Sequence, residues 1–544
     1  MEIRSFLKGF ISMLMLFIVL VACSNPDEVA TEETSQQDTE QNEEEKVLTI
    51  GATSEILTFN DLYTTQGADR EIAGLVFSAL TKTDVNGEAI PDLAESWENS
   101  DDGLVWTFYL REDVTWHDGK PFTADDVVFT YSIPLDQEYT GPRAYNFEAI
   151  ESIEALDEYT VQITLKEVVA PFLLRATTYN ILPEHILGDV PISELGEHEF
   201  NTRNPIGTGP FKFDEWVQGQ YIRFVANEEY FGGRPDIDVV IRKEVPDSNA
   251  MLAQFKAGDI DFLSLTAEDL PEAEALVSEG QAELVTGLSS GYTHIEYNLR
   301  NPLFEDKRVR QALTHALNRE EMVEVVLDGN GEVAHSPGLP LLWAFNEDVP
   351  KFEYDPERAK ELLAEAGWVD TDEDGILVNE QGERFSFNIL GNPTNEVRTQ
   401  MIQIAQQQWR EIGVEAVPQF MEGNALLEKI GPPNWDYDSA LLGWSVSLDP
   451  SVTGFFHSDE IENGLNRGGY SNPELDELMK ASEQTVDQEE RKELIEEIQA
   501  IIAEEQPYTF LYYSNSSKLH VPNLKGVEHH PTSTFFKISE WTLE

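Results

Sequence analysis

The sequence predicts a globular α/β protein in which strands lie between helices. Segments with the alternation or β-branched apolar content of strands occur mainly in the first half of the chain, and capped amphipathic helices occur mainly in the second. No fixed-period repeat is visible in the 544 residues. Hydrophobic residues make up 41% of the chain and aromatic residues 10%, which supplies ample core for two to four domains.

The first 22 residues have the pattern of an export signal. Arg4 and Lys8 precede an apolar stretch, residues 9–22, that is shorter than the roughly 20 residues a membrane-spanning helix needs. Leu20-Val21-Ala22-Cys23 resembles a bacterial lipobox, in which the cysteine sulfur takes a lipid and the chain is cut before it. Cys23 is the only cysteine, so it has no disulfide partner. We expect a lipoprotein signal peptide at 1–22 and a lipid on Cys23; the alternative is a plain signal peptide that happens to end in cysteine.

Residues 23–46 are acidic and lack apolar periodicity. Such a segment buries too little apolar surface to offset the entropy of ordering, so we expect a disordered acidic tether. The folded body then begins near Val47. A chain of this kind is held at the extracellular face of the cell membrane by its lipid, and a Gram-positive bacterium is the expected source.

The charge balance excludes one class of partner. The chain has 102 acidic and 36 basic side chains, for a formal net charge of −66. Nucleic-acid binding needs clustered Lys and Arg, so we expect no nucleic-acid partner.

Two strands are predicted in the first part of the body. The apolar segment 47–50 reads as a short buried strand followed by a loop. Further on, Trp106, Phe108 and Leu110 alternate with Val105, Thr107 and Tyr109, which is the period-two pattern of a strand. The residues 117–119, His-Asp-Gly, close that strand with a turn.

Three helical segments are predicted in the second half. The stretch 306–327 places Val309, Leu313, Ala316, Leu317 and Val323 on one face. The stretch 354–368 has Asp355 as N-cap, Pro356 at the first helical position and Gly367 at the C-terminal end. Asp487 and Glu490 open a third helix in the manner of a capping box.

One motif suggests an enzyme. Residues 287–291, GLSSG, match the G-x-S-x-G pattern in which Ser289 is a hydrolase nucleophile. That motif requires a helix directly afterwards, whereas the following YTHIEYNL alternates like a strand. A loop between strands is the preferred interpretation, with a surface serine hydrolase as a distant alternative.

Cofactor signals are weak. Asp370, Asp372 and Asp374 match the first positions of a calcium-binding EF-hand loop, but Gln381 stands where the bidentate Glu is required. An acidic hairpin turn is the preferred interpretation, and weak calcium binding is the alternative. Zinc-ligand spacing and a phosphate-binding G-x-x-x-x-G-K-[ST] motif are absent, so we expect no cofactor.

Six stretches across the mature chain occur together in one order: WTFYLREDVTWHDGKPFTADDVVFTY, NPIGTGPFKFDEWVQGQ, FKAGDIDF, DKRVRQALTHALNREEMV, YDPERAKELLAEAGW and YSNPELDELM. They resemble the family-5 extracellular solute-binding proteins, the receptors of bacterial peptide and nickel ABC importers. Four further stretches resemble the oligopeptide-binding lipoproteins of that family: FTYSIPLDQEY, LDGNGEVAHSP, PPNWDYDSALLGWSVS and EEQPYTFLYYSN.

The resemblance implies a two-lobed periplasmic-binding-protein-like fold (type II, cluster C) with an extra subdomain and a hinge that the chain crosses twice. Lobe I takes 47–290, with 91–204 as an inserted subdomain; lobe II takes 291–514; and 515–544 return to lobe I. It also implies a monomer that captures oligopeptides between the lobes and delivers them to the transmembrane subunits of an ABC permease. An extended peptide suits such a cleft, because its backbone pairs with strand edges while its side chains enter hydrated pockets.

The resemblance also implies three ligand-facing segments. These contribute Glu55, Leu57 and Phe59; then Tyr292, Tyr297 and Asn298; then Trp444, Ser445, Val446, Ser447 and Asp449. In peptide receptors of the family, an aspartate three residues after the tryptophan pairs with the α-amino group of the peptide. That position is Ser447 here, and Asp449 two residues on is the candidate replacement. Core packing for Trp444 and a turn role for Asp449 before Pro450 are the alternatives.

Two other functions stay open at this point. In the first, the same fold binds a non-peptide solute, such as a nickel complex or another small molecule, or a signalling peptide in place of a nutrient. A hydrolase that uses Ser289 is the more distant one. A receptor releases its peptide unchanged, whereas a hydrolase consumes it.

Overall fold

The computed structural model describes residues 45–371 and 374–544. The predicted signal peptide, the lipid site Cys23 and the tether up to residue 44 lie outside these residues. Lys46, at the end of the predicted tether, is already attached to the body: its backbone N–H and its side chain donate to Asp238 and Asp236, at 2.8 and 2.7 Å. Within the described residues, every helix is too short or too polar to cross a membrane.

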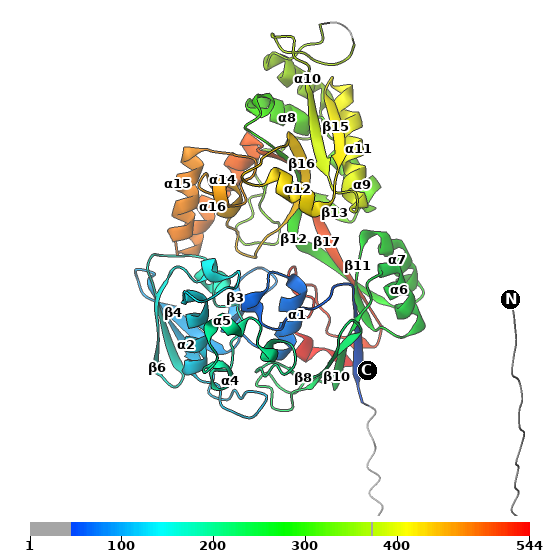
Figure 1. Cartoon of the computed structure of the whole chain (residues 1–544). Helices are drawn as coiled ribbons and strands as arrows, with labels where there is room; N and C mark the ends of the chain where they lie inside the picture. The colour runs from blue at the N-terminus through cyan, green and yellow to red at the C-terminus, as the bar shows by residue number, and fades with distance from the viewer. Residues whose placement is uncertain (1–44, 372–373) are drawn as a thin grey trace, which may run out of the picture. The chain divides into compact units, whose positions relative to one another are not determined.

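The largest sheet joins segments from both ends of the chain (Figure 1). Its strands run in the order β15 (Glu415–Phe420), β14 (Ser386–Gly391), β16 (Ser439–Ser445), β12 (Glu283–Tyr297), β17 (Tyr508–His520), β11 (Phe262–Leu265), β1 (Val47–Ala52), β10 (Val239–Glu244), β9 (Tyr221–Ala226) and β8 (Phe211–Val217), and β13 (Gly331–Val333) pairs with β17. Pairing is parallel between β1 and its two neighbours and between β14 and its two neighbours, and antiparallel elsewhere in this sheet.

The long strands β12 and β17 connect the two ends of this sheet. Residues 291–297 of β12 pair with β16, whereas residues 517–520 of β17 pair with β11. The two strands also pair with each other, residues 283–296 of β12 with residues 508–520 of β17, with register shifts between Leu288 and Tyr292 and between Thr293 and His294. One set of strands is β14, β15 and β16, and the other is β1, β8, β9, β10 and β11. The chain therefore passes twice between the two sets, once in β12 and once in β17, and these two strands lie side by side.

This pairing corrects the prediction of a loop at 287–291. The segment is part of the continuous strand β12, and the hydroxyl of Ser289 donates to the carbonyl of Ser514 on β17 at 2.8 Å. The glycines at either end of GLSSG suggested a loop, but here they accompany a strand irregularity, which Gly also favours. Ser289 does not stand on the strand-to-helix turn that a hydrolase nucleophile requires.

A separate antiparallel sheet lies within residues 94–165, in the order β4 (Ala94–Asn99), β5 (Val105–Leu110), β7 (Thr160–Leu165) and β6 (Ile150–Asp157). Trp106, Phe108 and Leu110 of β5 are buried, as their alternation predicts. Two small pairs complete the strands: β2 (Thr81–Thr83) with β3 (Ala89–Pro91), and β18 (Leu524–Lys525) with β19 (Thr542–Leu543).

The helices are more numerous and longer toward the C-terminal half. The first seven are α1 (Gly67–Val76), α2 (Ala124–Ser132), α3 (Phe172–Arg175), α4 (Glu184–Leu187), α5 (Ile192–Leu195), α6 (Ser248–Ala257) and α7 (Leu270–Ser278). They are followed by α8 (Lys307–His315), α9 (Arg319–Leu327), α10 (Pro356–Glu365), α11 (Glu396–Glu411), α12 (Gly423–Ile430), α13 (Thr453–Phe456), α14 (Glu460–Asn463), α15 (Pro473–Gln484) and α16 (Gln488–Glu505).

Helix ends follow the sequence closely where capping residues mark them. Asp355 accepts from the backbone N–H of Arg358 at the start of α10, and Gly367 beyond its end has a φ of 91°. Asp487 accepts from the N–H of Glu490 at the start of α16. The predicted helical stretch 306–327 instead forms two helices, because Asn318 breaks the run and its side chain caps α9. The apolar face survives the break, since all five predicted residues are buried.

Buried apolar side chains form separate cores on the two sides of the crossing. One core is built from residues between 48 and 262, with Leu524, Ile538 and Trp541 from the C-terminal segment. Two others are built from residues between 292 and 513. Each set of strands thus has a hydrophobic core of its own.

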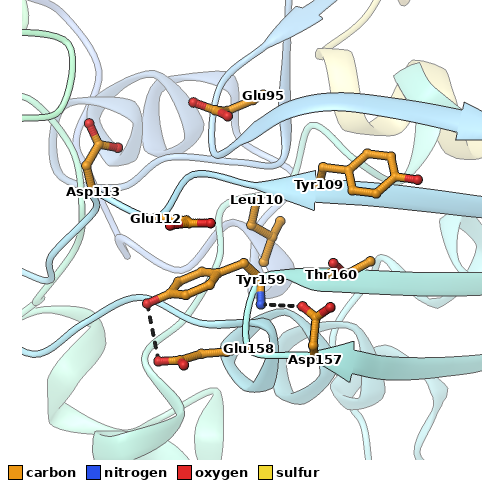
Figure 2. Close-up of a pocket in the computed structure, with 9 residues that line it drawn as sticks. All are labelled: Glu95, Tyr109, Leu110, Glu112, Asp113, Asp157, Glu158, Tyr159 and Thr160. Carbon is orange, nitrogen blue, oxygen red and sulfur yellow. Dashed lines mark hydrogen bonds between the residues drawn. The ribbon is translucent and has the colours of Figure 1, made fainter.

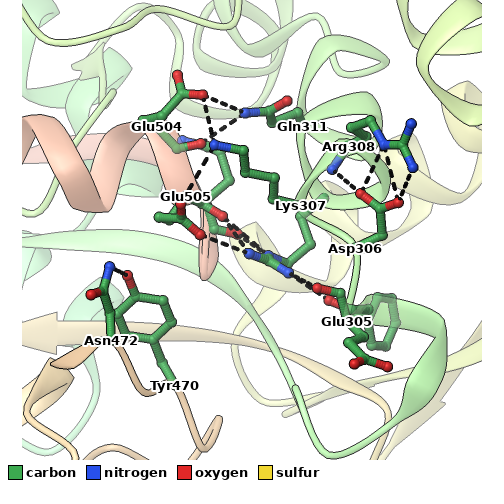
Figure 3. Close-up of polar contacts among 12 residues, drawn as sticks. Glu305, Asp306, Lys307, Arg308, Gln311, Tyr470, Asn472, Glu504 and Glu505 are labelled. Atoms are coloured by element: carbon green, nitrogen blue, oxygen red, sulfur yellow. Dashed lines mark hydrogen bonds and ion pairs between the residues drawn. The ribbon is translucent and has the colours of Figure 1, made fainter. Parts of the chain in front are cut away.

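The C-terminal end of α16 is held by α8, which packs against it (Figure 3). The guanidinium of buried Arg310 donates to the carbonyl oxygens of Glu505, Gln506, Phe304 and Glu305, at 2.6–3.2 Å. The last carbonyls of a helix have no partner within the helix, so this arginine satisfies groups that burial would otherwise leave unpaired. At the surface of the same contact, Lys307 pairs with Glu504 at 3.1 Å.

Candidate functional site

Two of the three predicted ligand-facing segments lie next to each other. Tyr292 on β12 stands opposite Trp444 on β16, and the backbone N–H of Val446 donates to the carbonyl of Ser290 at 2.8 Å. The ends of these paired strands lie where β12 crosses from one set of strands to the other. Ser445 and Ser447 are exposed, and Val446 is half-buried.

The third predicted segment, Glu55–Phe59, is anchored separately. Asp69, in the first turn of α1, is buried and accepts from the backbone N–H of Leu57 at 2.8 Å. The guanidinium of buried Arg242 donates to the carbonyl of Ser54 at 2.6 Å. These contacts hold the loop so that Leu57 is 54% exposed, an unusual position for a large apolar side chain.

Phe59, by contrast, is a core residue in this structure. It is 1% exposed and its ring packs edge-on against those of Phe213, Trp216 and Phe224 on β8 and β9. Glu55 is exposed at the other end of the loop.

Tyr297 and Asn298 are also turned inward. The hydroxyl of Tyr297 shares a hydrogen bond of 2.7 Å with the hydroxyl of Thr509. The side-chain amide of Asn298 donates to the carbonyl oxygens of Trp435 and Tyr437, at 3.1 and 2.8 Å. Both side chains therefore support the strands and the loop before β16 in this structure.

Trp444 lies at the outer end of a stack of rings. The buried ring of His294 lies between Tyr508 and Trp444, with ring centroids 4.2 and 6.1 Å away. The guanidinium of Arg467 lies over the indole, 5.0 Å from its centroid. Trp444 is half-buried, so it packs against the core on one side and retains an exposed edge.

His294 and Glu296 project from the same face of β12 and are 0% exposed. Nε2 of His294 lies 3.9 Å from Oε2 of Glu296, and the hydroxyl of Tyr437 donates to Oε1 at 2.5 Å. Burial lowers the pKa of His294, and the arginines 398 and 467 act in the same direction, whereas Glu296 opposes them. Sequence reasoning missed this pair, although its i, i+2 spacing on a predicted strand was the signal.

Asp449 is engaged by an arginine. Nη1 and Nη2 of Arg491 donate to its two carboxylate oxygens at 2.8 and 2.9 Å, and both side chains are buried. The N–H of Ser451 donates to the same carboxylate at 2.9 Å. The backbone N–H of Ser451 and the guanidinium of Arg491 thus already bind the carboxylate that the sequence analysis gives as the candidate partner of a peptide amino group.

A pocket of about 220 Å³ adjoins the crossing of β12 and β17. Its lining includes the arginine of α11 and several amide and hydroxyl side chains: Leu265, Thr266, Ala267, Leu270, Thr293, Leu327, Asn330, Asn395, Val397, Arg398, Tyr512, Ser514, Asn515 and Ser517. No acidic side chain is among these described lining residues. In a chain with 102 acidic residues, such a pocket is electrostatically distinct from the surface around it.

Arg398 gives this pocket its charge. Its guanidinium forms no ion pair with any carboxylate of the part of the chain that the structure describes. Burial lowers the pKa of Arg398, but an arginine side chain keeps its proton throughout the accessible pH range. The guanidinium lies against Gly443, where a Cβ atom would be 2.2 Å from Nη2. The absence of a side chain at 443 therefore lets a cation lie beside the predicted ligand-facing segment.

Sequence reasoning missed Arg398. It lies in the first turn of α11, which Asn395 caps. The distinguishing property of Arg398, a charged group without a counter-charge, exists only once the strands and α11 are assembled.

A larger hollow of about 710 Å³ lies on the four-stranded sheet (Figure 2). Five carboxylates line it: Glu95, Glu112, Asp113, Asp157 and Glu158. It contains no residue of the three predicted segments. Tyr159 points toward Glu158, to which its hydroxyl donates at 3.2 Å. We regard the hollow as part of the acidic surface and the pocket at Arg398 as the better candidate for a ligand site.

No group of three or more metal-ligating side chains occurs among the residues at 45–371 and 374–544. Of the calcium candidates, Asp374 pairs with Arg384, and Asp372 lies outside the described residues. Calcium binding at this loop stays a prediction.

Comparison with protein families decides the class. The model of the middle part of the bacterial extracellular solute-binding proteins, family 5, matches residues 88–462. The chain belongs to this family. Membership confirms the predicted two-lobed α/β fold and the prediction that this family-5 protein binds a solute and is not an enzyme.

Individual relatives cover nearly the whole chain. Oligopeptide-binding protein AppA of Bacillus subtilis (strain 168) is 44% identical over 534 residues, which cover 98% of this chain and 97% of that protein. The structure of Bacillus subtilis AppA in complex with a nonapeptide has a TM-score of 0.76 and 45% identity, covering 92% of this chain and 99% of that one. NikZ of Campylobacter jejuni, in complex with Ni(L-His), has a TM-score of 0.77 and 31% identity, covering 91% of this chain and 99% of that one.

Proposed function

We propose that this family-5 protein is a lipid-anchored receptor that captures oligopeptides between its lobes and delivers them to an ABC importer. The observation that carries the proposal is the acid-free pocket around Arg398, where β12 and β17 cross. The similarity to AppA, which binds oligopeptides, supports the same ligand class.

The chemistry of the pocket matches that of a peptide. A free peptide carries a terminal carboxylate, and Arg398 presents a planar guanidinium without a counter-charge. The amide side chains of Asn330, Asn395 and Asn515 line the pocket. Nδ2 of Asn515 donates to Oδ1 of Asn330 at 3.0 Å, and an amide has further donor and acceptor positions of the kinds that pair with peptide N–H and C=O groups. Binding through backbone groups and one carboxylate is indifferent to sequence, which suits a nutrient receptor.

The amino terminus of the peptide is treated differently in this proposal. Ser447 replaces the aspartate expected there, and the carboxylate of Asp449 is already paired with Arg491. We therefore propose that the α-amino group is not clamped by a carboxylate of this segment. Peptides of several lengths would then fit, because their amino ends lie further along the cleft.

The remaining parts of the proposal come from the sequence. Ligand contact by Glu55, Leu57, Trp444, Ser445, Val446 and Ser447 is proposed, as are the lobe limits 47–290, 291–514 and 515–544 and the subdomain 91–204. So are the lipid on Cys23, the monomeric state and the permease partner. Labelling of cells with a palmitate analogue tests the lipid, since a Cys23→Ser variant should take up none.

Native mass spectrometry of the purified protein tests the ligand. We expect masses above that of the chain, and sequencing after denaturation should return a mixture of intact peptides. Arg398→Gln, which removes the charge but keeps hydrogen-bonding groups, should bind an added mixed-sequence peptide pool at least tenfold more weakly. Arg358→Gln, on the exposed face of α10, is the matched control. A protein that carries no peptide and binds none of the pool would contradict the proposal.

A carboxylate-bearing small solute is the second candidate. The likeness to NikZ in complex with Ni(L-His) favours it, because histidine also offers a carboxylate to an arginine. The same mass spectra discriminate between the two: a single small mass in place of a peptide mixture would favour this candidate.

A further inference from the structure

The C-terminal end of α15 contacts segments from both sides of the crossing. The carbonyl oxygens in the last turn of a helix have no partner within the helix. Here the carbonyl of Ser482 accepts from Nε of Arg491 at 3.0 Å, and the carbonyl of Glu483 accepts from the backbone N–H of Ala170 at 2.8 Å. Ala170 belongs to the predicted subdomain, more than 300 residues earlier in the chain.

The side chain of Glu483 makes a second set of contacts at the same place. Its Oε2 accepts from Nη2 of Arg175, in α3, at 3.0 Å. Its Oε1 accepts from the hydroxyls of Ser451 and of Thr453, the latter at 3.2 Å. The Glu483 side chain is only 18% exposed. A positive charge near a helix C-terminus is also favoured by the helix dipole, so Arg175 is doubly stabilised there.

Ser451 extends the contact to the ligand-facing segment. Its hydroxyl donates to Glu483 while its backbone N–H donates to Asp449, which forms the buried pair with Arg491. Glu483 therefore lies two hydrogen bonds from the residue that ends the segment 443–449. A movement of α15 relative to residues 170–175 would therefore also move the segment 443–449, because Glu483 and Ser451 connect the two through hydrogen bonds.

Two close approaches support the same contact surface. A Cβ atom on Gly87 would lie 2.5 Å from the carbonyl oxygen of Leu448, and one on Gly103 would lie 3.0 Å from a methyl group of Val486. Both glycines have positive φ values; Gly87 lies in the turn between β2 and β3, and Gly103 in the turn between β4 and β5. Segments from the first 175 residues thus meet 448–486 at three places, with Glu483 at the one that carries charge.

We propose that Glu483 is a positioning residue that fastens the segment 170–175 to the ligand-facing segment 443–449, so that bound solute is released slowly while this contact holds. This inference rests on the proposed receptor function. It assigns the rate of solute release to two contacts of one side chain. Glu483 pairs with Arg175 of the segment 170–175, and it accepts from Ser451, next to the ligand-facing segment.

The dissociation rate of a fluorescent, mixed-sequence nonapeptide pool tests this role on the full chain. Glu483→Gln and Arg175→Gln each weaken the ion pair, and each should speed dissociation about two- to fivefold, the size expected for a partly exposed pair. The double variant should match the single ones, because one contact is removed in each case. Arg358→Gln, whose partners lie within α10, should leave the rate unchanged. The melting temperature should stay within about 2 °C throughout.

Hydrogen exchange provides a readout that does not need a ligand. Glu483→Gln should speed exchange in peptides that cover 166–176 and 445–455, and Arg358→Gln should not. Unchanged dissociation and unchanged exchange in both variants would overturn the inference. If the unaltered protein binds no peptide at all, the proposed function fails instead, and exchange alone decides the role of Glu483.

Discussion

The guanidinium of Arg491 and the carboxylate of Asp449 form a buried two-pronged ion pair, with hydrogen bonds of 2.8 and 2.9 Å. Burial lowers the pKa of Arg491, but the adjacent Asp449 carboxylate outweighs burial and the net shift is upward. Arg491 also donates to the carbonyl of Ser482 and lies over the ring of Trp343. The pair thus joins the start of α16, the end of α15 and the end of the ligand-facing segment.

Removal of one charge of this pair should be costly. Asp449→Asn removes the carboxylate that is paired with the buried guanidinium of Arg491, and we expect a loss of about 3 kcal/mol or more in the free energy of unfolding. Glu357→Gln, which breaks an exposed pair with Lys360, should cost less than about 1 kcal/mol. Urea unfolding measures both. Equal small losses in the two variants would show that the buried pair contributes no more than a surface pair.

The sequence identified Asp449 but not its partner. A carboxylate that stands before a proline and near a tryptophan can be recognised in the sequence. Arg491, by contrast, lies 42 residues later among the charged residues of a helix. Whether such a carboxylate is free for a ligand or held by an arginine depends on tertiary packing. In this structure the carboxylate of Asp449 accepts from the backbone N–H of Ser451 and from Arg491, as a turn and ion-pair role requires.

Local signals predicted helix ends well and longer-range breaks poorly. The caps at Asp355 and Asp487 act within one turn, so the sequence contains the whole interaction. The cap at Asn318 is equally local and divides the predicted helical stretch 306–327, whereas the continuity of β12 through Gly287 depends on its pairing with β17. Arg398 is the extreme case, because a missing counter-charge leaves no pattern in the sequence.

The position of Arg398 should depend on Gly443. A methyl group at 443 would meet Nη2 of Arg398 at 2.2 Å, and the flexible arginine side chain must move away to accommodate it. Gly443→Ala should therefore lower the affinity for a peptide pool at least several-fold while the melting temperature changes little. Gly454→Ala, in α13, meets no atom within 4 Å and is the matched control. If calorimetry gave an unchanged affinity for Gly443→Ala, the position of the Arg398 guanidinium would not affect ligand binding.

Arg310 should be among the most important polar residues for stability. Arg310→Met leaves the carbonyls of Phe304, Glu305, Glu505 and Gln506 without this donor, and we expect a loss of about 3–5 kcal/mol. Arg308→Met, on the exposed side of the same helix, should cost less than about 1 kcal/mol. Urea unfolding of both variants tests this. A loss below 1 kcal/mol at Arg310 would mean that water replaces the guanidinium at these carbonyls.

The free energy of unfolding should decrease as the pH falls below about 6.5, because several histidines have lowered pKa values in the folded protein. Burial lowers the pKa of His530 to about 4, and its Nδ1 accepts from the backbone N–H groups of Thr532 and Ser533. An unfolded histidine binds its proton near pH 6.5, so between pH 6.5 and 4 the unfolded chain binds more protons and the folded state loses stability as the pH falls. His117 and His335 have pKa values lowered to about 4 by burial and act in the same direction.

The contribution of His530 is best measured as a difference, because the other titrating groups then cancel. The stability advantage of the unaltered protein over His530→Gln should shrink by about 2 kcal/mol between pH 7.5 and pH 5. Asp61 provides a control of opposite sign: burial raises its pKa to about 6, so this carboxyl binds a proton in the folded state first and stabilises the protein as the pH falls. The advantage over Asp61→Asn should therefore grow over the same interval. If the stability advantage over the two variants changed with pH in the same direction, this would contradict a lowered pKa of His530 and a raised pKa of Asp61 in the folded state.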